Sequence, residues 1–156
     1  QETGYGIGLL LEFRRVLFRS AFGNGSYGMG FCLPRLDQAL YGLFTDLKER
    51  GMMDNTLVVV MGGFGRTPKV LTQQPPGRQH WPKCFSAIMA GCGIAGGNVY
   101  GKSDKHGAYV TSNPVRPEEM AATIYHALDI PLNEPQNNNG ISRPITTGKP
   151  VLELFG

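Results

Sequence analysis

Apolar residues recur at three- and four-residue spacing in two parts of the chain, and this pattern predicts two amphipathic helices. In the first part, residues 35–50, one apolar stripe is formed by Leu36, Leu40, Leu43, Phe44 and Leu47. Pro34 suits the first turn of this helix, and Gly51 suits the position just after its last residue.

The second helix is predicted to begin at Pro117 and to end at Ile130 and Pro131. One face of this helix carries Met120, Ala121, Ile124, Tyr125 and Leu128, and the opposite face carries a solvent-exposed His126. Glu118 and Glu119 favour the positive end of its helix dipole. Residues 21–33 and 133–140 show no useful period and are predicted to be loops.

Two short apolar runs, 56–61 and 85–90, are predicted to be β-strands. The β-branched run 57–60 is typical of a strand that is covered on both faces in a parallel sheet. The expected fold is therefore α/β, with a central, mostly parallel sheet flanked by helices. Such sheets bind their ligands beyond the carboxyl ends of the strands. The residues expected at that edge, after a glycine-rich turn, are Arg66, Thr67, Arg78 and His80.

The composition is that of one globular domain. The chain has 156 residues, of which 41% are hydrophobic and 17% charged, with a formal net charge of +3. Basic residues do not alternate with aromatic ones, which argues against a nucleic-acid partner. No apolar run reaches the length of a membrane span. The three cysteines follow no metal-ligand spacing and are expected to be buried free thiols.

The first twenty residues differ from the rest. Residues 11–20, LEFRRVLFRS, resemble the translation of a common sequencing-library adapter. An arginine pair also occurs in twin-arginine export signals, but no apolar segment or small-residue cleavage site follows it here. Residues 1–20 are therefore expected to be non-native, and residues 21–156 are expected to carry the fold.

Two segments match phosphate-binding patterns by their letters. Residues 91–96, GCGIAG, fit the dinucleotide fingerprint, and residues 96–103, GGNVYGKS, fit the P-loop. Both patterns function at the start of a helix, whose amides bind the phosphate. The residues that follow are poor helix formers, so we expect both matches to be chance. A nucleotide site at Lys102 remains a third-ranked hypothesis.

His80 lies between the predicted strands, with Arg66 and Arg78 close to it in sequence. An imidazole beside two guanidinium groups suits a phosphate or a sulfate, which arginine can bind through two parallel hydrogen bonds. The alternative is a structural histidine that packs beside Trp81 in a loop. Thr67 has no identifiable base beside it, so its hydroxyl is not assigned as a nucleophile.

A second polar cluster contains Ser103, Asp104 and His106. An aspartate and a histidine two residues apart can both bind a divalent metal. The alternative is that Asp104 simply shapes a turn.

Four segments together resemble the C-terminal part of a bacterial domain-of-unknown-function family, DUF1501, which is usually grouped with sulfatases and alkaline phosphatases. They are LPRLDQAL, DLKERGMMDNTLVVVMGGFGRTPKV, GRQHWPKCFSAIMAGCGIAGGNVYGKSDKHGAYV and RPEEMAATIYHALDI, and the resemblance covers residues 33–156. It implies an alkaline phosphatase- or sulfatase-like fold, truncated at its N-terminus, with a metal site at the strand ends. It also implies hydrolysis of sulfate or phosphate esters by an exported or periplasmic protein.

The resemblance assigns roles to residues that match the family's motifs. His80 would be a metal ligand, Asp104 and His106 would be outer ligands, and the ion would be Zn²⁺, Ca²⁺ or Mg²⁺. Arg66, Thr67 and Arg78 would face the ester anion. The family's GEFGRTP and GRDHW motifs carry carboxylates where this chain has Gly63 and Gln79. Glycine supplies no metal ligand, and glutamine supplies only a neutral carbonyl oxygen.

Two functions follow from these residues. The first is a fragment of a metal-dependent hydrolase of sulfate or phosphate esters, impaired as it stands, with a small-molecule or glycan ester as substrate. The second is a non-catalytic relative that binds an anionic glycan or partner.

Overall fold

The computed structural model describes residues 29–72, 77–133, 135–138 and 141–156. The segment 1–20, which the sequence predicts to be non-native, lies outside these residues, as does the predicted loop over 21–28.

The first described helix, α2, spans Met29–Glu49 and begins earlier than the sequence predicts. Pro34 lies inside the helix rather than at its first turn, and residues 29–33 are helical rather than a loop. A proline this close to the N-terminus removes only one helical hydrogen bond. Arg35 supports the same turn, because its guanidinium lies 3.5 Å from the Phe31 ring centroid and donates to the Phe31 carbonyl at 2.8 Å. The helix ends as predicted, with Gly51 at φ +64°.

The described strands form four separate antiparallel pairs. After the short 3₁₀ turn η1 (Met53–Asn55), β1 (Val58–Met61) pairs with β4 (Ala87–Ala90). Between them, β2 (Gly65–Arg66) pairs with β3 (His80–Trp81). β5 (Lys102–Ser103) pairs with β6 (Val110–Ser112), and β7 (Pro135–Asn138) pairs with β8 (Ile141–Pro144).

The prediction of a central, mostly parallel sheet flanked by helices is wrong. Both predicted strands exist, but β1 and β4 run antiparallel, with Val58 opposite Ala90 and Met61 opposite Ala87. Parallel neighbours need a crossover, usually a helix. The intervening residues 62–86 contain four prolines and fold back as the β2–β3 hairpin instead. The β1–β4 ribbon is also not covered on both faces, since Ile88 is 54% exposed.

The predicted polar loop at 133–140 is likewise wrong over its described part, where β7 forms a hairpin with β8. Cross-strand pairing of polar residues leaves no apolar alternation in the sequence, so the period-2 signal of a half-buried strand is missing there.

The second predicted helix is confirmed as α3 (Pro117–Ala127). Its Glu119 carboxylate accepts a hydrogen bond from the Arg116 amide at 2.7 Å, which closes the first turn. Ala122 is fully buried, and Thr123 is 1% exposed beside the C-terminal segment. The Thr123 hydroxyl donates to the Glu119 carbonyl at 2.7 Å and accepts from the Val151 amide at 3.0 Å. These two bonds attach the segment that ends in η2 (Leu152–Leu154) to α3.

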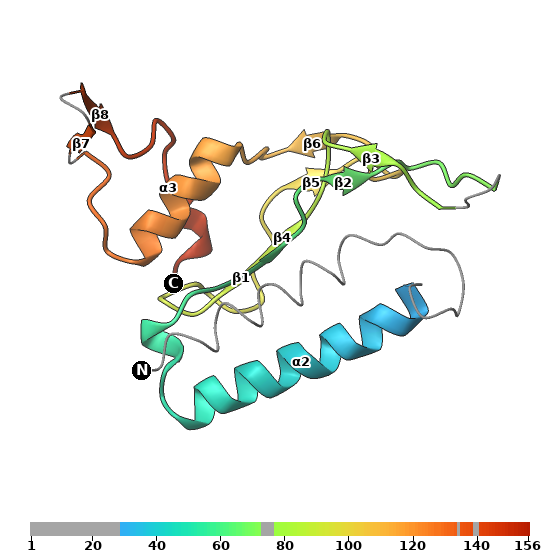
Figure 1. The fold of residues 1–156 in the computed structure, drawn as a ribbon, viewed down its shortest axis with the longest axis horizontal. Helices are drawn as coiled ribbons and strands as arrows, with labels where there is room; N and C mark the ends of the chain where they lie inside the picture. Colours follow the sequence, from blue (N-terminus) through green and yellow to red (C-terminus); the bar gives the residue numbers. More distant parts are fainter. Residues whose placement is uncertain (1–28, 73–76, 134, 139–140) are drawn as a thin grey trace.

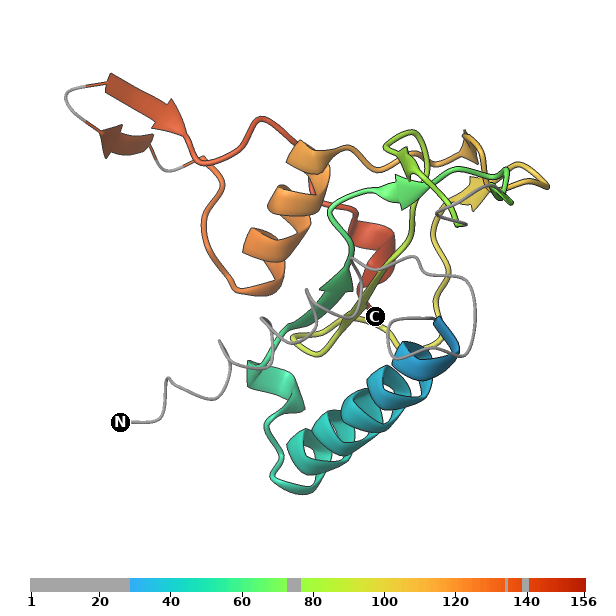
Figure 2. The same ribbon diagram turned by 45° about the vertical axis from the view of Figure 1, so that its right-hand side comes forward.

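The elements separate into distinct regions (Figures 1 and 2). α2 runs along one side, β1 and β4 cross the middle, and α3 lies toward one end with the β7–β8 hairpin projecting beyond it. The pairs β2–β3 and β5–β6 gather at the opposite end. In the described part of the chain, no helix has both the length and the apolar character required to cross a membrane.

We predict that Thr123→Val will lower the free energy of unfolding by about 1–3 kcal/mol, because the buried Val151 amide loses its acceptor. Thr123→Ser is the matched control, since it keeps the hydroxyl and loses only a methyl group. Denaturant unfolding of the three chains measures the difference. An equal loss of stability in both variants would contradict this role of the hydroxyl.

Candidate functional site

The β2–β3 hairpin brings together the four residues that the sequence predicts at a strand end. Arg66 and His80 are direct cross-strand partners, and Gly65 pairs with Trp81. Such partners present their side chains on the same face of the ribbon, close enough to act on one ligand. The arrangement comes from an antiparallel hairpin and not from the edge of a parallel sheet.

The Phe64 ring lies against both candidate ligand-binding groups, the His80 imidazole and the Arg66 guanidinium. Its ring lies 4.0 Å from the His80 ring, centroid to centroid, and the Arg66 guanidinium carbon lies 5.5 Å from the same ring. A cation within about 6 Å of an aromatic face is attracted by it. The phenyl ring therefore positions an imidazole and a guanidinium beside each other, and His80 is exposed to solvent.

Arg78 and Thr67 are used by the hairpin itself. The Arg78 guanidinium donates to the carbonyls of Thr67 and Pro68, at 2.9 and 3.0 Å. The Thr67 hydroxyl donates to the Lys69 carbonyl at 2.9 Å and accepts from the Gln79 amide at 3.1 Å. Both side chains thus fix the hairpin backbone, and the described contacts give the Thr67 hydroxyl no neighbouring base.

Gly65 explains why this strand can pass so close to its neighbours. A Cβ atom at this buried position would collide with the Cys84 carbonyl and lie 2.7 Å from the Trp81 carbonyl oxygen. Only glycine allows this close approach of backbones.

The second predicted cluster, Asp104 with His106, lies in the loop between β5 and β6. One Asp104 carboxylate oxygen, Oδ1, accepts from the amides of His106 and Ala108, at 3.0 and 2.8 Å. The Asp104 amide also donates to the Tyr109 carbonyl at 2.9 Å, and the Ser103 hydroxyl donates to the Asp104 carbonyl at 3.1 Å. The aspartate therefore shapes a turn, which is the alternative that the sequence left open.

Electrostatics agrees with that role. The pKa of Asp104 lies below its ordinary value of 3.8, chiefly because the Ala108 amide donates to the charged carboxylate, while desolvation opposes the shift. The His106 amide adds to the lowering.

Trp81 joins the two parts. Its indole Nε1–H donates to the Ala108 carbonyl at 2.6 Å, and its ring lies 5.6 Å from that of Tyr109 at an interplanar angle of 72°. The loop that holds Asp104 is thereby attached to the residue next to His80.

The described residues do not fit the divalent metal that the resemblance implies. They contain no group of three or more His, Cys, Asp or Glu side chains placed to hold an ion. Position 63 has no side chain and position 79 has no carboxylate, while the Oδ1 atom of Asp104 is bound to its own loop. His80, Asp104 and His106 are therefore not placed as a metal site, and we derive no chemical step through a metal.

The phosphate-binding patterns are also explained by the structure. Lys102 and Ser103, the last letters of the P-loop match, form strand β5 instead of opening a helix. At the other match, Gly91, Cys92 and Gly93 all have positive φ, in a turn bridged between Gly91 and Ile94. Neither segment begins a helix, which agrees with the prediction that both matches are chance.

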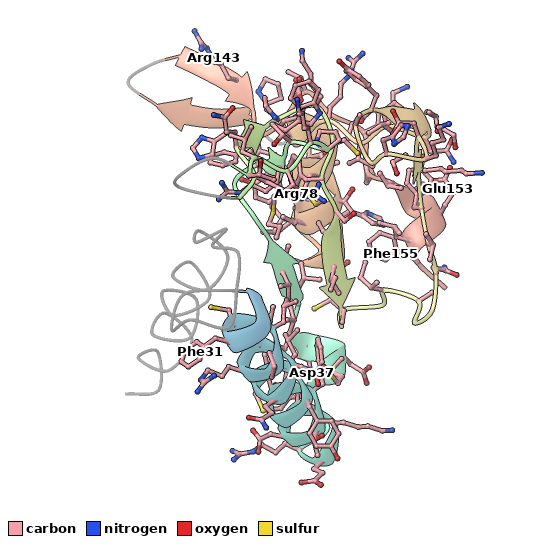
Figure 3. All side chains as sticks on the ribbon, turned by 90° about the vertical axis from the view of Figure 1, so that its right-hand side faces the viewer. Phe31, Asp37, Arg78, Arg143, Glu153 and Phe155 are labelled. Carbon is pink, nitrogen blue, oxygen red and sulfur yellow. The ribbon has the colours of Figure 1, made fainter. Side chains whose placement is uncertain are left out.

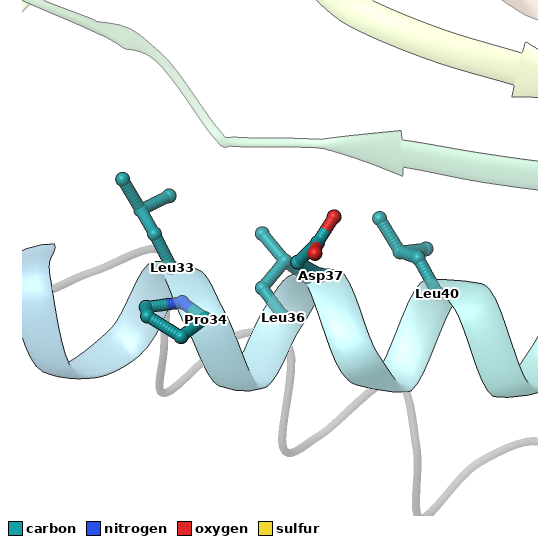
Figure 4. A pocket seen from close by; sticks show the side chains of 5 residues that line it. All are labelled: Leu33, Pro34, Leu36, Asp37 and Leu40. Atoms are coloured by element: carbon teal, nitrogen blue, oxygen red, sulfur yellow. The ribbon is translucent and has the colours of Figure 1, made fainter.

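The groove along α2 and the three cysteines are weaker candidates for a binding site. A groove along α2 is lined by Leu33, Pro34, Leu36, Asp37 and Leu40 (Figure 4). Of these residues, only Asp37 is charged, which does not suit an anion. The three cysteines are free as predicted, but only Cys32 is buried.

Two features of the site were not predicted from the sequence. One is the role of Phe64 between Arg66 and His80, which depends on strand pairing. The other is visible in the sequence: no Asp or Glu lies between Asp54 and Asp104. That interval carries Arg66, Lys69, Arg78, Lys83 and Lys102. The sequence of the β2–β3 hairpin and its flanks is therefore rich in basic residues and contains no acidic one.

We predict that Asp104→Ala will accelerate hydrogen exchange at the His106 and Ala108 amides several-fold, because both lose their acceptor. Asp104→Asn, which keeps an acceptor oxygen, should have a smaller effect.

The same turn should depend on pH. Since the folded-state pKa of Asp104 is lowered, the stabilisation that its carboxylate gives the turn is present above pH 3.8 and is lost as the pH falls through the lower folded-state pKa. Unchanged exchange in Asp104→Ala would contradict the turn-forming role.

Comparison with known proteins identifies the family. Residues 23–155, which are most of the chain, match the family described as protein of unknown function (DUF1501). No match was found among curated proteins or among solved structures. The chain therefore belongs to the DUF1501 family.

Proposed function

We propose that this chain binds a sulfate or phosphate ester group at the β2–β3 hairpin without a metal ion. The observation that carries this proposal is the cross-strand pair of Arg66 and His80, with Phe64 between them. A guanidinium has five N–H donors and can bind more than one acceptor at once. An exposed imidazole beside it supplies a further donor to the same oxyanion.

The charge around the pair supports an anionic ligand. Lys69, Arg78 and Lys83 are exposed on or next to the same hairpin, and no carboxylate occurs between Asp54 and Asp104. A cluster of exposed basic side chains raises the local concentration of anions and speeds their association.

The family resemblance agrees with this ligand class. Sulfatase- and phosphatase-like proteins act on such esters. We propose that this chain is related to them. The same resemblance predicts export from the cell, where sulfated glycans and small esters are available. Positions 63 and 79 lack the two carboxylates of the family motifs. The proposed function is therefore binding of the ester without its hydrolysis.

We predict that Arg66→Gln will weaken binding of p-nitrophenyl sulfate and p-nitrophenyl phosphate about tenfold, as expected for the loss of one charge-assisted hydrogen bond. Calorimetry in the presence of a chelator measures the affinity, and the two probes distinguish sulfate from phosphate. Arg50→Gln is the matched control, since it removes the same charge from the end of α2, where Arg50 pairs with Asp46.

Equal affinity of Arg66→Gln and Arg50→Gln would contradict the assignment of the site. No binding of either probe by the original chain would contradict the function. Binding that requires a divalent ion would favour the hydrolase instead.

The second candidate is the metal-dependent ester hydrolase, favoured by the hairpin contacts that bring Arg66, Thr67, Arg78 and His80 together. Gly63 directly precedes Phe64, whose ring contacts His80. We predict that Gly63→Glu combined with Gln79→Asp, in a chain fused to the N-terminal half of a family member, will bind Zn²⁺, Ca²⁺ or Mg²⁺ and hydrolyse aryl sulfate or phosphate.

Calorimetry with each metal and release of the aryl product test this candidate, and the two single substitutions are the controls. A double variant that binds metal no better than either single variant, and shows no turnover, would exclude the hydrolase.

A further inference from the structure

A second group of basic side chains lies beside the hairpin, on the β5–β6 pair. Lys102, Lys105 and His106 are all exposed there. The one carboxylate of this pair, Asp104, accepts hydrogen bonds from its own loop amides and so has its negative charge partly compensated locally. The β5–β6 pair thus presents mainly positive charge to solvent.

Formal positive charge is concentrated in the middle of the sequence. Residues 62–112 contain six Lys and Arg residues and one Asp, a formal charge of +5, whereas the full chain has +3 and the rest of it therefore −2. In Figure 3, Arg78 lies among the side chains of the upper part of the view, and Asp37 lies on α2 in the lower part. The end formed by β2, β3, β5 and β6 is here called the basic end.

The two hairpins of the basic end are held together by packed groups. The Trp81 indole donates to the Ala108 carbonyl at 2.6 Å and packs against Tyr109. Figures 1 and 2 both show the four strands grouped. A fixed arrangement lowers the entropic cost of engaging both hairpins with one ligand.

We expect one ester group to contact the basic side chains of only one of the two hairpins. Consecutive residues of a strand point to opposite faces, so the Trp81 side chain and the loop that it contacts lie across the ribbon from His80. Hydrogen bonds to one oxyanion act within about 3 Å. Contact with Arg66 on one hairpin and Lys105 on the other therefore requires a ligand with several anionic groups along its length.

We infer that the ligand of the basic end is a chain with several sulfate or phosphate groups, and specifically a sulfated polysaccharide rather than a small ester. This rests on the proposed function, of which it specifies the ligand. Nucleic acid is disfavoured, because the basic residues do not alternate with aromatic ones along the sequence.

Heparin oligosaccharides of increasing length test the inference against p-nitrophenyl sulfate, with the full chain and a chelator present. We expect the longer oligosaccharides to bind about 100-fold more tightly than the single ester, through simultaneous engagement of both hairpins. Lys102→Gln with Lys105→Gln should abolish most of that gain and leave the affinity for the single ester unchanged. The matched control is Lys48→Gln with Lys149→Gln, which removes the same charge outside the basic end.

The outcomes separate the inference from the proposed function. Equal affinity for oligosaccharide and single ester, or equal effects of the two double variants, would overturn the inference alone. Single-stranded DNA of matched charge that binds as tightly as heparin would overturn the choice of a polysaccharide. Absence of binding by every anion would overturn the proposed function as well.

Discussion

The register of the β2–β3 hairpin is the constraint on which the site depends. Thr67 and Gln79 exchange contacts across the ribbon, with the Thr67 amide donating to the Gln79 carbonyl at 2.9 Å and the Gln79 amide donating to the Thr67 hydroxyl at 3.1 Å. A slip of one residue would move every side chain to the opposite face. The Arg78 guanidinium stabilises the same register by donating to the Thr67 and Pro68 carbonyls. Ligand binding is therefore assigned chiefly to Arg66 and His80.

The local elements were predictable, and their pairing was not. Helix α3 follows from apolar periodicity and from the proline at its start, and strands β1 and β4 follow from short apolar runs. All of these are local properties of the sequence. Strand direction depends on what the chain does between two strands, here residues 62–86, where prolines and glycines favour reversal over a crossover helix. The polar β7–β8 hairpin left no hydrophobic signal to detect.

The candidate site was predicted only in part, because it too depends on how the strands pair. Arg66, Thr67, Arg78 and His80 do come together, but three of them also bond to the hairpin backbone, Arg66 through one long contact of 3.5 Å to the Arg78 carbonyl. The spacing of Asp104 and His106 fits both a metal pair and a turn, and the positions of the His106 and Ala108 amides distinguish them. Phe64 gained its place through cross-strand contact, which spacing along the chain does not encode.

The central claim is that the cross-strand pair Arg66 and His80 holds an oxyanion without a metal. The most direct test is to titrate p-nitrophenyl sulfate into isotopically labelled protein with a chelator present, and to follow the amide resonances by NMR. We expect the shifts to concentrate at residues 64–67 and 78–81, with smaller changes in the β5–β6 loop. Shifts confined to α2 or α3, or no shifts at saturating ester, would contradict the claim.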